Sequence, residues 1–149
     1  MKKRGFTLVE LATAITVLGI IALIATPIMI NMIEISKKGM AKEGANNYLL
    51  AVDTAISTQR FNSSVEDGLY YVMTDGNLCK GIIDNTTCDG KKLKVQVSGT
   101  FPGIGSQVVI ENEKAVEHVA GSPTIKTILI INGYNVVFDD NGILNIPEE

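Results

Sequence analysis

The chain has 149 residues, enough for a single domain, and its 16 acidic and 13 basic side chains give a net charge of −3. This acidic balance argues against a general nucleic-acid-binding surface, because such a surface needs basic groups to neutralise phosphates. No nucleophile, acid and base fall at a catalytic spacing, and no glycine-rich phosphate loop is present. The sequence therefore predicts a non-enzymatic protein without a cofactor or a metal.

The mean hydropathy of +0.23 is high for a soluble protein, and residues 1–33 account for much of it. A short basic start ends at Gly5 and is followed by an apolar stretch that one acid, Glu10, interrupts. Residues 11–33 then form 23 positions without a charge, and a membrane-spanning helix needs about 20. A carboxylate in such a segment costs on the order of 3 kcal/mol at mid-bilayer, so Glu10 needs an interface or a partner.

Three interpretations of this segment compete. A secretory signal peptide should end in small residues at a cleavage site, but those around Ala22 and Ala25 form no A-x-A pattern. The apolar run also continues past Pro27 to Ile33, beyond the length of a usual signal core. A simple transmembrane anchor fits the length but leaves Glu10 unexplained.

The third interpretation rests on residues 5–11, Gly-Phe-Thr-Leu-Val-Glu-Leu, with Gly19 and Pro27 downstream. This pattern resembles the N-terminus of type IV prepilins over about the first 30 residues. The resemblance implies that a prepilin peptidase cuts between Gly5 and Phe6 and that the new terminal Phe6 is N-methylated. It places Glu10 and Pro27 at the fifth and twenty-second positions of the mature chain.

The chemistry of the cut supports the resemblance, because cleavage creates a charged amine on Phe6, about one helical turn from Glu10. In a filament, the Glu10 carboxylate can pair with the Phe6 amine of a neighbouring subunit and so fix the axial register. A buried carboxylate and ammonium tolerate apolar surroundings together far better than either does alone.

The basic start is made of Lys2, Lys3 and Arg4, which hold the N-terminus in the cytoplasm by the positive-inside rule. The rest of the chain is then exported from the cytoplasmic membrane. Removal of these three residues leaves 10 of the 13 basic side chains against 16 acidic ones, so the exported part is more acidic still. A local cluster, Lys91, Lys92 and Lys94, is interpreted as a solvated strand start.

The apolar helix is expected to continue beyond the membrane. An apolar face recurs at helical spacing in residues 34–59, at Ala41, Ala45, Tyr48, Leu49, Val52, Ala55 and Ile56. A helix from Phe6 to about Gln59 would be ~80 Å long, with residues 6–33 projecting and residues 34–59 packed under a sheet. Gly19 and Pro27 weaken it. Pro27 is either a tolerated kink or, as the resemblance implies, part of a stretch that unwinds or bends in a filament.

Residues 60–90 are rich in Asn, Asp, Gly, Ser and Thr and predict an irregular loop with at most one short helix or strand. Cys79 and Cys88 lie in this loop, and two cysteines in an exported domain are expected to pair. The bond would contribute about 2–3 kcal/mol by the loop-entropy model. Two free thiols are the alternative; a metal site lacks further ligands, since His118 is alone.

The C-terminal part, residues 91–147, predicts an antiparallel sheet. Strands are expected at residues 93–97, 107–110, 125–131, 134–138 and 143–146. Residues 113–120 fit a short helix or a strand equally well. Asn132-Gly133 predicts a type I′ hairpin turn, and Asp140-Asn141-Gly142 a second turn. A run such as Asp139-Asp140-Asn141-Gly142 can bind calcium but is far more often a hairpin turn.

The predicted fold class is therefore α+β, with a long N-terminal helix packed on a C-terminal antiparallel sheet of four or five strands, which matches the pilin fold. The predicted function is that of a structural subunit that polymerises with copies of itself into a type IV pilus at the cell surface. The resemblance implies an assembly ATPase and a platform protein as partners. The tasks of motility, adhesion, aggregation and DNA uptake stay open.

Two other functions remain in competition with the pilus subunit. The alternative within the same superfamily is a pseudopilin of a type II secretion or competence system, which shares the N-terminal chemistry. A membrane-anchored binding domain that never polymerises would keep residues 1–5 uncut.

Overall fold

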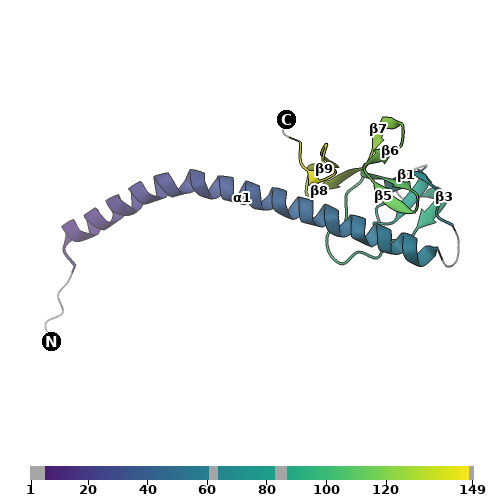
Figure 1. The fold of residues 1–149 in the computed structure, drawn as a ribbon. Coiled ribbons are helices and arrows are strands. Elements are labelled where there is room, and N and C mark those ends of the chain that lie inside the picture. Colours follow the sequence, from purple (N-terminus) through teal and green to yellow (C-terminus); the bar gives the residue numbers. More distant parts are fainter. Residues whose placement is uncertain (1–5, 61–63, 83–86, 148–149) are drawn as a thin grey trace. The chain divides into compact units, whose positions relative to one another are not determined.

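The computed structural model describes residues 6–60, 64–82 and 87–147 (Figure 1). The chain divides into two units, Met1–Lys37 and Lys38–Glu149, and each is described by itself. The fold class is α+β, as predicted: one long helix precedes a sheet of many antiparallel strands.

The helix, α1, runs from Leu8 to Gln59 over 52 residues, close to the bounds predicted from the sequence. It passes Gly19 and Pro27 without a break in this single chain. Thr26 donates its hydroxyl to the carbonyl of Ala22 at 2.7 Å, a local bond that leaves no polar group of this side chain facing apolar surroundings. The predicted unwinding near Pro27 concerns the assembled filament and stays a prediction.

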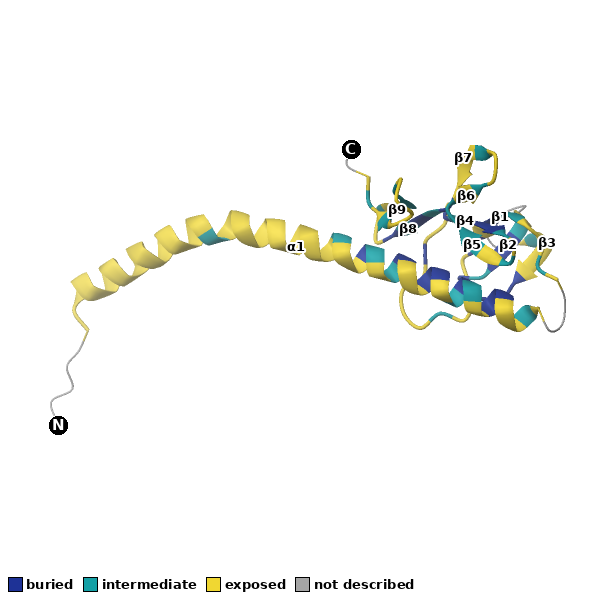
Figure 2. Cartoon of the chain, in the orientation of Figure 1, coloured by how far each residue is buried: buried dark blue, intermediate teal, exposed yellow. Residues whose placement is uncertain are grey.

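In the first unit, α1 has no partner within the described chain. Every large apolar side chain from Phe6 to Ile35 is exposed, and the ribbon of this part of α1 is almost entirely yellow, the colour of exposed residues, in Figure 2. By length and composition this is a helix that can cross a membrane.

In the second unit, one face of α1 is buried against the sheet. It consists of the seven residues predicted from the helical spacing, Ala41 to Ile56. They share a core with strand residues such as Tyr70, Leu78 and Ile131. Burial of each large apolar side chain is worth about 1.5–3 kcal/mol, so this core accounts for the packing of the helix on the sheet.

Tyr48 is the largest side chain that α1 contributes to this core, and it is completely buried. Its hydroxyl donates to the Gly76 carbonyl at 2.9 Å, which satisfies its one polar group. Burial raises the pKa of this phenol well above its usual range, so Tyr48 stays neutral at any physiological pH.

The main sheet is antiparallel and has the order β10-β9-β8-β4-β1-β2-β3, with β5 also paired to β4. One edge of β4 pairs with β1, while the other edge is shared by β8 at Gln107 and by β5 further along. The strands of this sheet are β1 Gly68–Val72, β2 Leu78–Ile82, β3 Cys88–Leu93, β4 Gln107–Glu111, β5 Lys114–Val116, β8 Ile128–Ile131, β9 Tyr134–Phe138 and β10 Leu144–Asn145. A separate pair is formed by β6 His118–Val119 and β7 Ser122–Lys126.

The prediction that residues 60–90 form an irregular loop with at most one short helix or strand is wrong, because the stretch contains β1, β2 and the start of β3. In β1, Tyr70 and Val72 are buried and alternate with exposed Tyr71. Both edges of β1 are paired, with β2 and β4. Gly68, Gly81 and Gly90 lie within these strands, and such glycines hid the alternation from a composition-based interpretation.

The strand predicted at residues 93–97 ends at Leu93 instead. The predicted alternation is present, since Leu93 and Val95 are buried while Lys94 is exposed. The partner strand β2 begins at Leu78, directly opposite Leu93, so no further ladder is available. The backbone amide of Val95 donates to the side-chain oxygen of Asn77 at 2.9 Å in place of a strand partner.

The strand predicted over residues 125–131 is divided at Thr127 into β7 and β8. Thr127 is buried and joins three segments: its amide donates to the Glu117 carbonyl at 2.7 Å. Its hydroxyl accepts from the Val109 amide at 2.9 Å and donates to the Val116 carbonyl at 2.6 Å. The ambiguous residues 113–120 form β5 and β6, and so are strands.

The Asn132-Gly133 turn is confirmed. Both residues have positive φ, 53° and 83°, as a type I′ turn requires, and the turn sets Ile131 opposite Tyr134. The second turn is held by the Asp139 carboxylate, which accepts from the amides of Asn141 and Ile143 at 2.9 Å each. The last strand, β10, has only two residues. The main sheet has eight strands rather than the four or five expected.

Candidate assembly site

The candidate site lies at the start of α1, where Thr7 and Glu10 bond to each other reciprocally. The Glu10 Oε2 atom accepts from the Thr7 backbone amide and from the Thr7 hydroxyl, both at 2.9 Å. The Glu10 amide donates to the Thr7 hydroxyl oxygen at 3.3 Å. This is a capping box: Thr7 is the N-cap, Glu10 is the third helical residue, and two amides without helical partners are satisfied.

The capping box gives Glu10 a partner that the sequence interpretation missed, because that interpretation looked for one on a neighbouring subunit. The signal was available, since a Thr followed three residues later by Glu just before an apolar run is typical of a helix start. Both bonds from Thr7 end on Oε2. Within the described residues the Oε1 atom accepts no hydrogen bond, so the capped carboxylate keeps one oxygen for another donor.

The apolar half of the helix also contains threonines whose hydroxyls donate hydrogen bonds to the backbone of the preceding helical turn. The hydroxyls of Thr13 and Thr16 donate to the carbonyls of Val9 and Ala12 at 2.6 and 2.8 Å. Bonds of this kind to the preceding turn allow a threonine to face lipid or another helix without an unpaired polar group. By sequence, Glu10 is the only charged side chain between Phe6 and Ile33.

The other predicted site residues of the helix are separate from the capping box. Phe6 is 88% exposed just before the helix, while Gly5, on the other side of the predicted cut, lies outside the described residues. Gly19 and Pro27 are both helical. Pro27 has no amide, so the Leu23 carbonyl lacks its usual helical donor. A Cβ at Gly19 would meet nothing within 4 Å, so the surface there is open.

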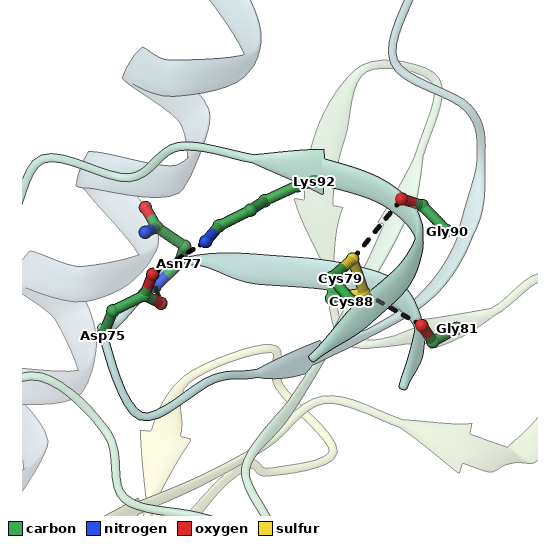
Figure 3. The surroundings of a disulfide bond; sticks show 7 residues. All are labelled: Asp75, Asn77, Cys79, Gly81, Cys88, Gly90 and Lys92. Atoms are coloured by element: carbon green, nitrogen blue, oxygen red, sulfur yellow. Dashed lines mark hydrogen bonds and ion pairs between the residues drawn. A yellow bond between two sulfur atoms is a disulfide. The ribbon is translucent and has the colours of Figure 1, made fainter. Parts of the chain in front are cut away.

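The second predicted site, the Cys79–Cys88 disulfide, is present, with the two Cα atoms 5.7 Å apart (Figure 3). It links β2 to the first residue of β3. The sulfurs lie 3.0 and 3.4 Å from the carbonyl oxygens of Gly81 and Gly90. A Cβ at Gly90 would lie 1.6 Å from the Lys80 carbonyl oxygen, so only glycine permits this close approach of the strands.

Ion pairs flank the disulfide-linked hairpin. Lys92 of β3 donates to Asp75 at 2.8 Å, and the same carboxylate accepts from the Asn77 amide at 3.1 Å. The lysine bond, above all, lowers the pKa of Asp75 to about 2. Lys91 and Lys80 bond to Glu66 at 2.7 and 3.1 Å and lower the pKa of that carboxyl as well.

These contacts correct the interpretation of the lysine cluster as a merely solvated strand start, because Lys91 and Lys92 each have an acidic partner.

The head offers no arrangement for metal chemistry within the described residues, where no three His, Cys, Asp or Glu side chains come together to hold an ion. Asp139, the first residue of the run that resembles a calcium loop, uses its carboxylate to hold the turn. His118 lies 3.8 Å from Glu117 on the surface.

Comparison with known proteins identifies the N-terminal segment. A search of curated proteins and a search of solved structures find no significant match. The family described as the prokaryotic N-terminal methylation motif matches residues 1–26, a range that includes Phe6, the capping box and Gly19 but ends just before Pro27. This motif is the class III signal peptide of type IV pilins and implies processing by a prepilin peptidase. The first 26 residues of the chain therefore match the prokaryotic N-terminal methylation motif, which supports a pilin-like or pseudopilin-like precursor.

Proposed function

We propose that this chain is a structural subunit that polymerises into a type IV pilus after a prepilin peptidase cuts between Gly5 and Phe6. The observation that carries the proposal is the pairing of the methylation motif with an apolar helix that is exposed along its whole first unit. Such a helix cannot remain in water, so it needs lipid before assembly and other helices after it.

In the membrane, the basic start of the precursor holds the N-terminus on the cytoplasmic side. The capping box lowers the cost of Glu10 there, because its Oε2 atom already accepts two hydrogen bonds from Thr7. The exported part, from residue 34 onwards, carries the α+β head.

In the fibre, the amine of Phe6, which is N-methylated in our proposal, pairs with the Glu10 carboxylate of a neighbouring copy. The Oε1 atom of Glu10, which accepts no hydrogen bond from the described residues, is the acceptor available for that contact. Only one axial offset between helices brings the amine and the carboxylate together, so the pair fixes the register. The unpaired carbonyl opposite Pro27 makes the Gly19–Pro27 stretch the place where α1 unwinds or bends in the fibre.

The proposed subunit is self-associating and depends on an assembly ATPase and a membrane platform protein. Both are implied by the resemblance to type IV prepilins. The direct test is mass spectrometry and N-terminal sequencing of material sheared from the cell surface, together with electron microscopy using an antibody to residues 60–149. We expect long labelled fibres made of a chain that begins at N-methylated Phe6.

The test also separates the competing functions. Short envelope structures without surface fibres would assign the chain to a pseudopilin of a secretion or competence system. A mature protein that retains residues 1–5 would contradict processing and favour a membrane-anchored domain that never polymerises.

A further inference from the structure

The head has an exposed apolar loop, residues 98–105, between β3 and β4. It lies within an uncharged run from Val95 to Ile110. Phe101 and Ile104 are 43% and 55% exposed on it, although large apolar side chains elsewhere in the head are mostly buried. An aromatic and an aliphatic side chain on an uncharged surface are typical of the centre of a protein interface.

The apolar loop is held in place by the sheet. The Gly103 amide donates to the Ile130 carbonyl at 2.8 Å. The Ile130 amide donates in return to the hydroxyl of Ser106, which is completely buried. A Cβ at Gly76 would lie 3.1 Å from the Phe101 ring, so the ring rests directly on that turn. An ordered loop loses little conformational entropy when it binds.

The head also has an open groove of about 570 Å³ between α1 and the β9–β10 turn, a volume within the ~300–1,000 Å³ usual for binding sites. Its apolar lining includes Leu49, Phe138 and Leu144, with Leu50 and Ile143 at 57% and 63% exposure. Charged side chains also line it: Lys42, Glu43 and Asp53. We call this the α1–β10 groove.

The apolar loop and the α1–β10 groove are on opposite flanks of the helix. The groove is lined by Asn46, Leu50 and Asp53 of α1. The segment leading into the loop, with Lys94 and Gln96, lies beside Ala51 and Ala55. With 3.6 residues per turn, these two sets lie on either side of the buried face.

We infer that the α1–β10 groove receives the apolar loop of a second copy of this chain. The loop is uncharged, so its entry buries no charge, while the charged residues of the groove can remain at its rim. Because one copy offers the loop on one flank and the groove on the other, the contact is heterologous and repeats from copy to copy. A heterologous contact that does not close produces an open helical polymer. The inference rests on the proposed filament and names its contact between heads.

The test uses the full-length chain in cells that display its fibres, with Ile104→Cys and Ile143→Cys combined. The native cysteines are bonded to each other, so the added thiols are the free ones. A short bis-maleimide should convert the double variant into a ladder of dimers, trimers and higher multimers. Each single variant should stay monomeric. The matched control is Ile125→Cys with Ile143→Cys, because Ile125 is also exposed, at 39%, but lies on β7; it should give no ladder.

The other outcomes of the cross-linking test separate the failure of the contact from the failure of the filament. Dimers from Ile104→Cys alone would mean that two loops meet each other. A ladder from Ile28→Cys with Ile143→Cys, and none from the loop pair, would assign the groove to the apolar helix of a second copy. If the double variant Ile104→Cys with Ile143→Cys forms fibres at the native yield but gives no ladder, the contact is overturned while the proposed filament is retained. A ladder without fibres would keep the contact and overturn the filament, and the absence of both would overturn both.

Charge substitutions supply an independent readout. Ile104→Lys and Ile143→Lys should each lower fibre yield at least tenfold, because either one replaces an apolar side chain of the contact with a charged one, while Ile125→Lys should leave it unchanged. Retention of the Cys79–Cys88 disulfide and of a protease-resistant head should show that each variant folds. Normal fibre yield from folded Ile104→Lys and Ile143→Lys variants would overturn the inference.

Discussion

At the scale of single residues, the start of α1 depends on Thr7 as much as on Glu10. Three hydrogen bonds connect the two residues, and all of them involve atoms of Thr7. The apolar side chains that follow cannot perform this task, because the first amides of a helix need polar acceptors. Thr7 is thus the residue that decides where the helix begins.

Replacement of Thr7 by alanine should loosen the first turn. Loss of an N-cap hydroxyl costs about 1 kcal/mol, which corresponds to roughly fivefold faster hydrogen exchange of the Glu10 amide. The measurement is amide exchange by NMR on the full chain in detergent micelles. Thr13→Ala is the control, since the Thr13 hydroxyl only donates to the preceding turn. Unchanged exchange at Glu10 in Thr7→Ala would contradict the cap.

Asp75 links stability to pH. Its pKa is lowered to about 2 from the usual value of about 3.9. The ionised form is therefore the one that folding favours. Its contribution is fully present above about pH 4 and disappears as the pH falls towards 2. Because the Asp75 side chain is 45% exposed, solvent screens the pair with Lys92, and the contribution stays below about 1 kcal/mol.

Asp75→Asn should therefore unfold slightly more readily than the native head at pH 6, and the difference should shrink as the pH falls from 4 towards 2 and below. Thermal unfolding followed by circular dichroism, in full-length protein in detergent, measures the difference across this range. Asp140→Asn, a matched acid on the exposed turn, should show no such convergence. A difference between Asp75→Asn and the native protein that is undiminished at pH 2 would rule out the ion pair as its cause.

At the scale of elements, the β2–β3 hairpin is fixed by the disulfide, by two sets of ion pairs and by Gly90. A register shift between Lys80 and Ile82 allows the cysteines to meet although they are not directly opposite in the ladder. The hairpin needs glycine at position 90 because the Lys80 carbonyl occupies the space of a side chain.

Gly90→Ala should accordingly destabilise the head by at least about 2 kcal/mol, since a backbone oxygen cannot move aside as a flexible side chain would. Gly103→Ala is the control, because its nearest neighbour, the Ile130 carbonyl oxygen, lies at 3.6 Å, an ordinary contact. Urea unfolding of the two full-length variants in detergent compares them. Equal stability would mean that β2 and β3 can separate without cost.

The sequence predicts elements best where periodicity and turn chemistry agree. The amphipathic half of α1 and the β8–β9 hairpin with its Asn-Gly turn are confirmed because spacing alone determines them. The division at Thr127 is not predictable in this way, since Thr127 is held by the backbones of Val109, Val116 and Glu117, which are distant in sequence or on other strands. The end of β3 at Leu93 depends likewise on where its partner begins.

At the scale of the whole molecule, the proposed function gives Glu10 two tasks, capping the helix and setting register, and a single substitution can separate them. Glutamine can still accept the capping bonds from Thr7, but it carries no charge for the Phe6 amine of another copy. Glu10→Gln should therefore insert in the membrane, fold and be cleaved normally, yet yield at least tenfold fewer fibres. The measurements are membrane fractionation and the yield of sheared fibres.

Glu10→Asp serves as the comparison, because it keeps the charge but shortens its reach, and it should retain more assembly than Glu10→Gln. If Glu10→Gln forms fibres at the native yield, the carboxylate does not set register by charge. If it also fails to insert, the charge of Glu10 is needed in the membrane before assembly, because glutamine keeps the cap.

The sequence predicted the residues of the candidate sites but not how they are arranged in space. The motif around Gly5 and Glu10 and the pair Cys79 and Cys88 are local patterns, so the sequence sufficed for them. The apolar loop and the α1–β10 groove combine residues from four regions of the chain, and no spacing rule brings Leu50 next to Ile143. Such surfaces arise only when the sheet is packed on the helix.

The position of the capping box has a consequence for maturation. Thr7 and Glu10 both follow the predicted cut, so the helix start at Leu8 is complete before the leader is removed and remains complete afterwards. The proposed cleavage removes the three basic side chains of residues 1–5 and moves the terminal amine from Met1 to Phe6. In the proposed function, the peptidase would therefore act as an electrostatic trigger on a helix that is already complete.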